Sequence, residues 1–285
     1  MKINTNVAAL TAQEANANTN LALQRSLEKL SSGLRINKAS DDASGLSIAD
    51  KLRTQASSIG QSISNANAGV SLVQIADKAM AEESNILDII KTKLLQAGTA
   101  TTSSAGADAI AKDINKLLDQ INNIARQTNY NGVSLLQISA SGTGATAGLT
   151  FQVGESANDE ITTSGNIQAN VPGMGLTSLK SVASAGGSAL TQTAASAMLT
   201  EIDSALNSLN TWRSDFGSTQ NQLESATRNM MTQQTNIKAA ESVIRDVDYA
   251  QESANFNKQN IISQAGTYAL SQANQVSQNV LRLLQ

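Results

Sequence analysis

The sequence predicts a mostly α-helical protein, a long antiparallel bundle of coiled-coil type with a small β-hairpin region in the middle of the chain. Three observations carry this prediction. Apolar residues recur at helical spacing through both ends of the chain, aromatic residues make up only 2% of the 285 residues, and glycine and serine gather between about 130 and 190. Because a globule of this length normally relies on bulky rings, small and aliphatic side chains favour long, closely packed helices.

The first predicted helix runs from about 5 to 33. It closes on Gly33, a residue that can adopt a left-handed conformation at a helix end. Its apolar side chains lie at helical spacings and comprise Val7, Leu10, Leu21, Leu27, Leu30 and Leu34. The next segment, INKASDDASG, favours a turn, and Asp41 or Asp42 is expected to cap the helix that follows. This turn is a candidate joint between two rigid pieces.

The second predicted helix, from about 44 to 98, has the clearest apolar pattern of the N-terminal half. Steps of seven, four and three predict a coiled-coil seam roughly 80 Å long. The seam comprises Leu52, Ile59, Ile63, Ala66, Val70, Val73, Met80, Leu87, Ile90 and Leu94. A loop from Gly98 to Gly106 leads into a further helix, which has Ile110, Ile114, Leu117, Ile121 and Ile124 on one face.

Helical spacing is lost in the middle of the chain. The stretch from Leu149 to Val153 alternates in the manner of a strand and is bounded by turn residues. We expect a small β-hairpin region with loops here. It needs a surface to pack on, because isolated hairpins are only marginally stable.

The C-terminal third restores a long heptad and predicts a helix from about 190 to 245. The residues seven apart are Ile202, Leu209, Phe216, Leu223, Met230, Ile237 and Ile244. Several companion positions are small or polar, so the seam is narrow on one side. After Asp246 and Asp248 a last helix runs essentially to the chain end, with Ile262, Ala269, Ala273, Val276, Val280 and Leu284 as its apolar set.

The apolar stripes of the two terminal helices predict self-association. A lone helix gains little stability in water unless its stripe is buried, and a pair of helices still leaves apolar surface uncovered. Head-to-tail association that does not close makes a helical filament. The alternative is that both stripes fold back onto the central helices as an ordinary bundle. In the filament interpretation we expect the central helices to fold alone and the termini to order only on assembly.

The composition weakens most enzyme interpretations. The chain has no histidine and no cysteine, which removes the commonest general base, the commonest metal ligands and the thiolate nucleophile. We interpret the carboxylate pairs Asp41–Asp42, Glu82–Glu83 and Asp246–Asp248 as helix caps and solvated surface. We therefore predict no catalytic, cofactor-binding or metal site. A formal charge of −3 suggests no nucleic-acid or anionic-lipid partner, and no window reaches the length of a membrane span or a signal peptide.

Several sequence blocks resemble those of bacterial flagellins. They are INTNVAAL near the start, LEKLSSGLRINKASDDASGLSIADKLR at 27–53, NANAGVSLVQIADKAM at 65–80, QTNYNGVSLL at 127–136, and the end of the chain from AAESVIRDVDYAQESANFNKQNIISQAG to LSQANQVSQNVLRLLQ. They cover both halves in the right order. The resemblance implies a structural subunit that polymerises into the extracellular filament of a bacterial flagellum for swimming motility.

The resemblance also implies an organisation. Residues 1–43 and 246–285 would form the inner tube of the filament as a coiled coil of terminal helices. Residues 44–136 and 193–245 would form the outer-tube helices, and residues 137–192 a hairpin and loop region with no large outer domain. The chain therefore resembles a short flagellin, and its Ser and Thr in the middle region are candidate O-glycosylation acceptors by analogy: Ser139, Ser141, Thr143, Thr162, Thr163 and Ser164.

The resemblance implies partners as well. They are other copies of the chain, an export chaperone, a cap protein and hook-associated junction proteins, with secretion through the flagellar type III apparatus and no cleaved signal peptide. Two alternatives stay open at this point. One is a junction or hook-associated protein that shares the terminal helices. The other is a secreted coiled-coil effector or adhesin, which would stay monomeric.

One segment departs from the family pattern. Many flagellins carry a sequence resembling LQRVRELAVQ, which an innate immune receptor of vertebrates binds. The corresponding residues here are Leu87, Asp88, Ile89, Ile90, Lys91, Thr92, Lys93 and Leu94, followed by Leu95 and Gln96. The arginines that could bind a carboxylate through two hydrogen bonds are missing. The pattern is more similar to flagellins of the epsilon class of proteobacteria, which evade this receptor. The alternative is neutral drift on a solvent-facing surface.

Overall fold

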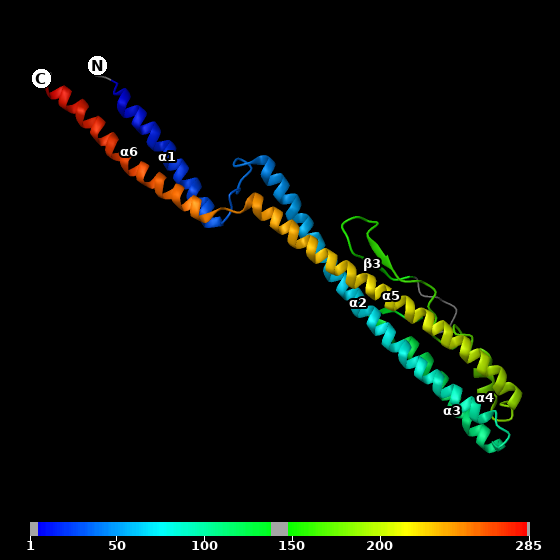
Figure 1. The fold of residues 1–285 in the computed structure, drawn as a ribbon. Coiled ribbons are helices and arrows are strands. Elements are labelled where there is room, and N and C mark those ends of the chain that lie inside the picture. Colours follow the sequence, from blue (N-terminus) through cyan, green and yellow to red (C-terminus); the bar gives the residue numbers. More distant parts are fainter. Residues whose placement is uncertain (1–4, 138–147, 284–285) are drawn as a thin grey trace. The chain divides into compact units, whose positions relative to one another are not determined.

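The computed structural model describes residues 5–137 and 148–283, with side chains described up to Val276 and at Gln278. The order of elements is α1 (Val7–Ser32), α2 (Ala43–Ala97), α3 (Ser104–Gln127), β1 (Asn129–Tyr130), β2 (Val133–Ser134), β3 (Thr150–Gln152), β4 (Glu160–Thr162), α4 (Thr177–Ala185), α5 (Gln192–Arg245) and α6 (Tyr249–Leu283). The mostly helical prediction is confirmed (Figure 1). Two compact units divide the chain, residues 1–57 with 234–285, and residues 58–233.

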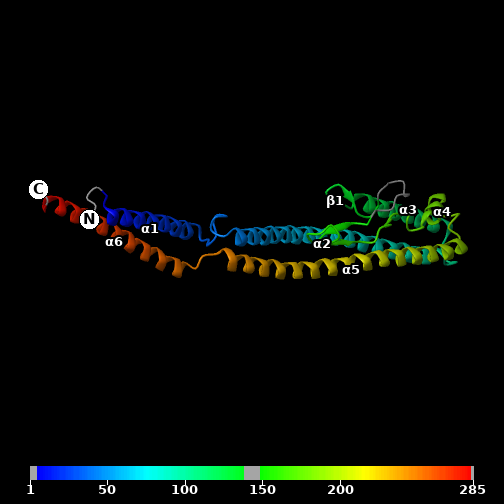
Figure 2. The same ribbon diagram turned by 90° about the horizontal axis from the view of Figure 1, so that it is seen from above.

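The first unit is built on α1 and α6, which lie side by side and run antiparallel (Figures 1 and 2). The side chain of Asn6 caps α1 by accepting a hydrogen bond from the Ala9 amide at 3.1 Å. At the other end Gly33 adopts φ 74°, and its amide donates to the Lys29 carbonyl. This left-handed conformation is the helix end that glycine favours. The unit also holds the first turns of α2 and the last turns of α5, where Gln234 Nε2 donates to the Ala56 carbonyl.

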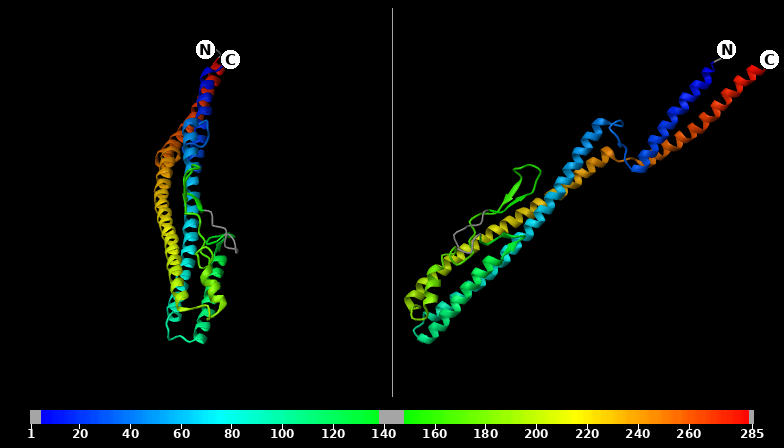
Figure 3. Two further views of the ribbon diagram at one scale, coloured as in Figure 1. Left: turned by 90° about the vertical axis from the view of Figure 1, so that its right-hand side faces the viewer. Right: turned by 180° about the vertical axis from the view of Figure 1, so that it is seen from behind.

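The second unit contains the long antiparallel pair of α2 and α5, with α3 beside α2 (Figures 2 and 3). Ion pairs join neighbouring helices. Arg213 of α5 contacts Asp77 of α2 at 2.9 Å, and Lys93 of α2 contacts Asp113 of α3 at 2.8 Å. Between the helices lies a core of aliphatic residues and Phe216, which is the largest fully buried side chain of the described residues.

Heptad spacing explains why α2 packs along so much of its length. Eight positions of α2 follow one another at steps of three and four, and all eight are buried: Val73, Ala76, Met80, Glu83, Leu87, Ile90, Leu94 and Ala97. The facing heptad of α5 is buried from Ile202 to Met230. Ile237 and Ile244, the last two predicted positions of that heptad, are only half-buried. Apolar spacing therefore predicted this core correctly from Val73 to Leu94 of α2 and from Ile202 to Met230 of α5, whereas the predicted positions Ile63 and Val70 are only half-buried.

The middle region contains two hairpins and a short helix. β1 and β2 are joined by Asn131 and Gly132, which both have positive φ, as a tight two-residue hairpin turn requires. β3 and β4 pair antiparallel, with Phe151 opposite Ile161. α4 packs on α3, and Lys180 contacts Asp119 at 2.6 Å. The sequence predicted a hairpin region here but did not predict α4.

The β3–β4 hairpin is anchored on both long helices. Phe151 lies so close to Gly69 of α2 that a Cβ built at position 69 would be 2.8 Å from the ring. Asn65 Nδ2 donates to the Gln152 carbonyl at 3.3 Å. On the side of α5, the amide and hydroxyl of Ser164 both donate to the Asp215 carboxylate. These contacts supply the neighbouring surface that an isolated hairpin lacks.

Candidate assembly surface

The bulky apolar side chains of α1 lie on its exposed side. Val7 is 64% exposed, Leu10 55% and Leu21 54%, and Leu27 is about half exposed. The positions that are shielded from solvent follow one another at steps of three and four and are mostly small or polar: Ala9, Ala12, Asn16, Thr19, Leu23, Ser26 and Leu30. An ordinary amphipathic helix buries its bulky stripe. In α1 the seam with α6 instead uses mostly small or polar side chains, with Leu23 and Leu30 as its large members, and leaves Val7, Leu10 and Leu21 more than half exposed.

Close approach and polar contacts hold the α1–α6 seam together. Ser26 donates a hydrogen bond to the Glu252 carboxylate, and Ser263 donates to Asn20 at 3.0 Å. Near the start of α1, Asn6 Nδ2 donates to the Ala273 carbonyl at 3.1 Å. A Cβ built at Gly266 would be 3.6 Å from Asn16, an ordinary contact distance. Ser26 is the one buried residue of α1, so the seam shields its other positions only in part.

α6 also exposes large apolar side chains. Ile262 and Val276, both predicted from spacing, are exposed, and so is Ala269. Sequence reasoning missed Ile261, which is 67% exposed, and Tyr268, which is 74% exposed. These two residues are seven apart, so a second heptad line directly beside the predicted one was the signal that could have found them.

The remaining predicted interface residues lie elsewhere. Leu30 and Ala273 belong to the seam within the unit and are half-buried. Leu34 is half-buried and forms a β-bridge with Asp246. Leu284 and the side chain of Val280 lie outside the described residues.

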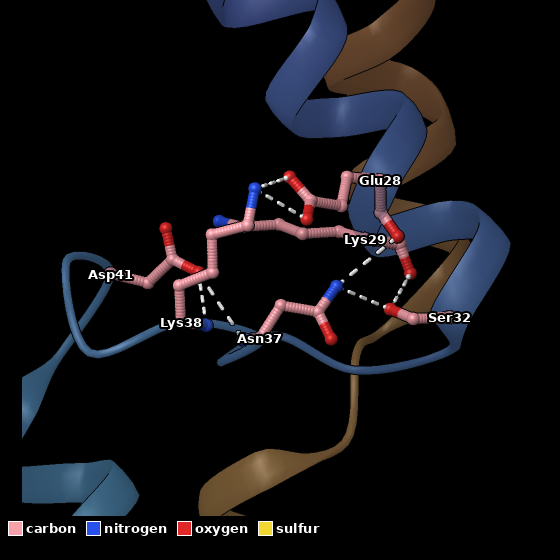
Figure 4. A network of polar contacts seen from close by, with 6 residues as sticks. All are labelled: Glu28, Lys29, Ser32, Asn37, Lys38 and Asp41. Carbon is pink, nitrogen blue, oxygen red and sulfur yellow. Dashed lines mark hydrogen bonds and ion pairs between the residues drawn. The ribbon is translucent and has the colours of Figure 1, made fainter.

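The segment after α1 is held by a polar network (Figure 4). Asn37 Nδ2 donates to the Ser32 hydroxyl at 2.7 Å, and Lys38 forms an ion pair with Glu28 at 2.7 Å. Asp41 accepts hydrogen bonds from the amides of Asn37 and Lys38. The hydrogen bond from Lys38 is the main reason why the pKa of Asp41 lies below its usual value. The turn predicted as a joint is thus tied back onto the last turns of α1.

The two chain segments that leave the α1–α6 pair are bonded to each other. The Arg35 amide donates to the Arg245 carbonyl at 2.6 Å, and the Val247 amide donates to the Gly33 carbonyl at 3.0 Å. The Arg35 guanidinium also donates to the Ile244 carbonyl at 2.6 Å. That carbonyl lies in the last turn of α5, where helix carbonyls lack partners within the helix and a cation is favoured. Arg35 therefore joins the segment after α1 to the end of α5.

The acidic pairs behave differently from one another. Asp42 caps α2 by accepting from the Gly45 amide at 2.9 Å, and Asp248 accepts from the amides of Ala250 and Gln251 at the start of α6. Glu82 is exposed. The interpretation of Glu83 as surface is wrong, because Glu83 occupies a position of the α2 seam and is 0% exposed. Burial away from water raises the pKa of Glu83 to about 9.

The segment that corresponds to the innate-receptor sequence is divided between core and surface. Leu87, Ile90 and Leu94 are buried in the α2 seam. Its two lysines are engaged within the protein, Lys91 with Asp203 and Lys93 with Asp113. The exposed side chains of the eight residues are Asp88, Ile89 and Thr92. Both lysines of this segment are thus partly exposed but already paired with an aspartate.

The candidate glycosylation residues differ in access. Thr162 and Ser164 are exposed, although Ser164 is bonded to Asp215. Thr163 is buried, and its hydroxyl accepts a hydrogen bond from the Leu149 amide at 2.9 Å. A buried, bonded hydroxyl is a poor acceptor for a bulky sugar. Ser139, Ser141 and Thr143 lie outside the described residues.

No helix in the described part of the chain is both long and apolar enough to cross a bilayer.

Comparison with known proteins identifies the family. Residues 3–143 match the bacterial flagellin N-terminal helical region, and residues 199–284 match the bacterial flagellin C-terminal helical region. A flagellin of Bacillus subtilis is 36% identical over 309 aligned residues that cover all of both chains. Flagellin A of Helicobacter mustelae is 51% identical over 160 residues, which cover 56% of this chain and 31% of that one. The crystal structure of Bacillus cereus flagellin is 28% identical, covers 62% of this chain and 94% of that chain, and superposes with a TM-score of 0.49.

The two flagellin regions together span both ends of the chain. They also answer the two alternatives, since a full-length relative is itself a flagellin. The chain belongs to the bacterial flagellin family, and it is a short, non-enzymatic flagellin that serves as the structural subunit of the extracellular flagellar filament.

Proposed function

We propose that the exposed stripes of α1 and α6 form the polymerisation interface of the filament. The observation that carries this proposal is the burial pattern of α1, which pairs with α6 through mostly small or polar side chains and leaves Val7, Leu10 and Leu21 more than half exposed. Burying a leucine of this kind contributes about 1.5–3 kcal/mol. A soluble subunit gains that energy only when another copy covers the stripe. The proposed interface comprises Val7, Leu10, Leu21, Leu27, Ile261, Ile262, Tyr268, Ala269 and Val276.

A charged residue in this stripe tests the interface. Leu10→Asp leaves the α1–α6 seam untouched, because Leu10 is exposed, but it would bury a carboxylate wherever the stripe is covered. We expect the variant to be a folded monomer that does not add to filament seeds in a sedimentation assay. Val133→Asp, at an equally exposed position in the β1–β2 hairpin, is the matched control and should assemble. Normal filaments from Leu10→Asp would sink the proposed interface.

We further propose the tube arrangement that the family suggests for the parts of the chain. Residues 1–43 and 246–285 supply the inner tube, residues 44–136 and 193–245 the outer tube, and residues 137–192 a hairpin and loop region with no large outer domain. The pairing of α1 with α6 supports the first assignment. Electron cryomicroscopy of filaments tests it, and a central channel that is not lined by α1 or α6 would contradict it.

Partners other than the chain itself are also a proposal. The exposed apolar residues of α6, such as Ile261 and Tyr268, need cover before assembly, and an export chaperone that wraps this helix would supply it. Cap and hook-associated proteins would then meet the same stripes at the ends of the filament. Co-purification of an added chaperone with the full chain, and its loss from the Tyr268→Asp variant, would support this.

We also propose that this flagellin escapes the innate receptor. The exposed surface of the segment offers Asp88, Ile89 and Thr92, and both of its lysines are paired with aspartates. A receptor that reads arginine through paired hydrogen bonds finds no such group here. A cell reporter assay with depolymerised protein should show little activation, and Ile89→Arg should increase it. Full activation by the unaltered protein would contradict the proposal.

A further inference from the structure

Glu14 is a charge without a partner on the exposed stripe of α1. Among the described residues it enters no hydrogen bond or ion pair, and it is exposed. Along α1 it lies between Leu10 and Leu21, the two exposed leucines of the proposed interface. If another copy covers this stripe, the carboxylate loses its water, which is costly unless a cation replaces it. The stripe therefore needs a positive group on whatever covers it.

A groove between α1 and α6 carries positive charge in excess. The groove has a volume of about 560 Å³, and its walls include Leu21, Arg25 and Lys29 of α1 and Glu252, Asn255 and Gln259 of α6. The guanidinium of Arg25 has no partner among the described residues. Glu252 already accepts a hydrogen bond from Ser26. Two cations thus face one carboxylate that is partly engaged, and an incoming carboxylate would complete the balance of charge.

The spacing of residues on α1 allows Glu14 of one copy to reach the positively charged groove of another. Glu14 and Arg25 are eleven residues apart, which is three helical turns and roughly 16 Å, so they share one line along the helix but cannot meet within one chain. A second α1 that lies parallel to the first and is displaced by eleven residues sets Glu14 against Arg25. The same displacement sets Leu10 against Leu21, which lines the groove. The ionic contact between Glu14 and Arg25 and the apolar contact between Leu10 and Leu21 therefore form at the same displacement of the two helices.

We propose that α1 of a second copy lies along the α1–α6 groove in this register, with its Glu14 bound by Arg25 and Lys29 and its Leu10 against Leu21. The contact uses different residues on its two sides and displaces each copy along the helix by eleven residues, so it repeats from copy to copy without closing. The proposal rests on the proposed polymerisation interface and names how one copy is placed on the next.

Charge reversal tests the pairing. Glu14→Arg and Arg25→Glu should each raise the critical concentration for assembly by roughly tenfold or more, because each brings like charges together. A mixture of the two variants should assemble, since each offers the charge that the other lacks, and so should the double variant. Asp88→Arg and Lys238→Glu, reversals at exposed residues outside the terminal helices, serve as matched controls and should assemble normally. Circular dichroism of each monomer checks that α1 and α6 stay helical.

Cross-linking gives a second measurement that does not depend on charge. The chain has no cysteine, so Glu14→Cys combined with Arg25→Cys introduces the two thiols alone. Oxidised filaments should give a ladder of covalent oligomers, because a disulfide needs Cα atoms about 4.4–6.8 Å apart and the two positions are too far apart within one chain. Either single-cysteine variant should stay monomeric on a denaturing gel.

The outcomes separate the two proposals. Normal assembly of Glu14→Arg, failure of the mixture to assemble, or oxidised filaments without a ladder each overturn the Glu14–Arg25 register, while Leu10→Asp still decides the wider interface. A ladder that stops at dimers overturns it too, since a repeating contact cannot stop there.

Discussion

Glu83 is an ionisable residue at a position of the α2 seam where the spacing calls for an apolar side chain. Its neighbours along the α2 seam are Met80 and Leu87, and all three side chains are fully buried. Neither carboxyl oxygen of Glu83 has a hydrogen-bond partner among the described residues. Since its pKa is raised to about 9, the side chain is protonated and neutral at pH 7. The sequence contained the signal, because position 83 fits the steps of three and four, but charged residues are conventionally assigned to the surface.

The raised pKa of Glu83 predicts a direction for the effect of pH on stability. The unfolded chain releases this proton near its ordinary pKa of 4.5, whereas the folded chain holds it up to about 9. The contribution is therefore fully present below pH 4.5 and is lost as the pH rises towards 9, at about 1.4 kcal/mol per pH unit. Glu83→Met should remove this slope and raise the free energy of unfolding at pH 7 by roughly 3 kcal/mol.

Urea unfolding of the monomer at pH 5, 7 and 9 measures this prediction. Glu82→Met, at the exposed neighbouring position, is the control and should leave the pH dependence unchanged. Parallel pH profiles for Glu83→Met and the unaltered chain would show that Glu83 does not titrate between the two pKa values.

Among the elements, the long helices were predictable and the small ones were not. The predicted helices from 5 to 33 and from 44 to 98 correspond to α1 and α2, with ends that differ by one or two residues. Long apolar repeats specify such helices without outside help. α4 has nine residues, of which Leu179 and Ala183 are buried. Two apolar positions are too few to distinguish a helix from a loop, so its packing on α3 decides its structure.

The missing side chain at Gly69 leaves space for the Phe151 ring, and this contact positions the β3–β4 hairpin on α2. We call this space the notch at Gly69. A Cβ at this position would be 2.8 Å from the Phe151 ring and 3.2 Å from Leu223. Gly69→Ala should therefore displace the ring and lower the free energy of unfolding by about 1–2 kcal/mol, although alanine is the better helix former. Hydrogen exchange of the hairpin amides should accelerate more than that of α3.

Gly217 provides the matched control for this substitution. It lies in the middle of α5, and a Cβ there meets nothing within 4 Å. Gly217→Ala should therefore stabilise the protein by about 0.5–1 kcal/mol. A stabilising effect of both substitutions would show that Phe151 does not depend on the notch.

At the scale of the molecule, the sequence predicted the class of the protein and the helices that carry the interface, but not which side of each helix is covered. Spacing alone placed Leu30 and Ala273 with the exposed residues, whereas the structure puts both in the seam between α1 and α6. Two stripes on one helix have the same period. What separates them is residue type taken over the whole helix, because the seam is mostly small or polar although it includes Leu23 and Leu30.

The small seam predicts that the terminal helices open easily in the monomer. Ser26 is the one buried residue of α1, whereas the second unit holds most of the buried core. Low burial means a low free energy of local opening. Limited trypsin digestion should therefore cut first at Arg25, Lys29 and Lys258 and leave a core that lacks somewhat under about 30 residues at each end.

Filaments of the same protein serve as the control for this digestion. The terminal sites should be protected once another copy covers the stripes. Terminal helices of the monomer that resist trypsin as long as Lys91 and Lys93 would contradict a weak seam.

The bridge between Leu34 and Asp246 has a consequence for how the filament carries load. A single connecting segment rotates about its backbone bonds and transmits almost no torque between the two helices that it joins. Here two chain segments connect the terminal helices to the long helices, one between α1 and α2 and one between α5 and α6. Hydrogen bonds donated by the amides of Arg35 and Val247 join these two segments. Two segments that are hydrogen-bonded to each other resist rotation about their backbone bonds better than either segment would alone. We therefore expect a twist applied to the terminal helices to reach the long helices through this joint.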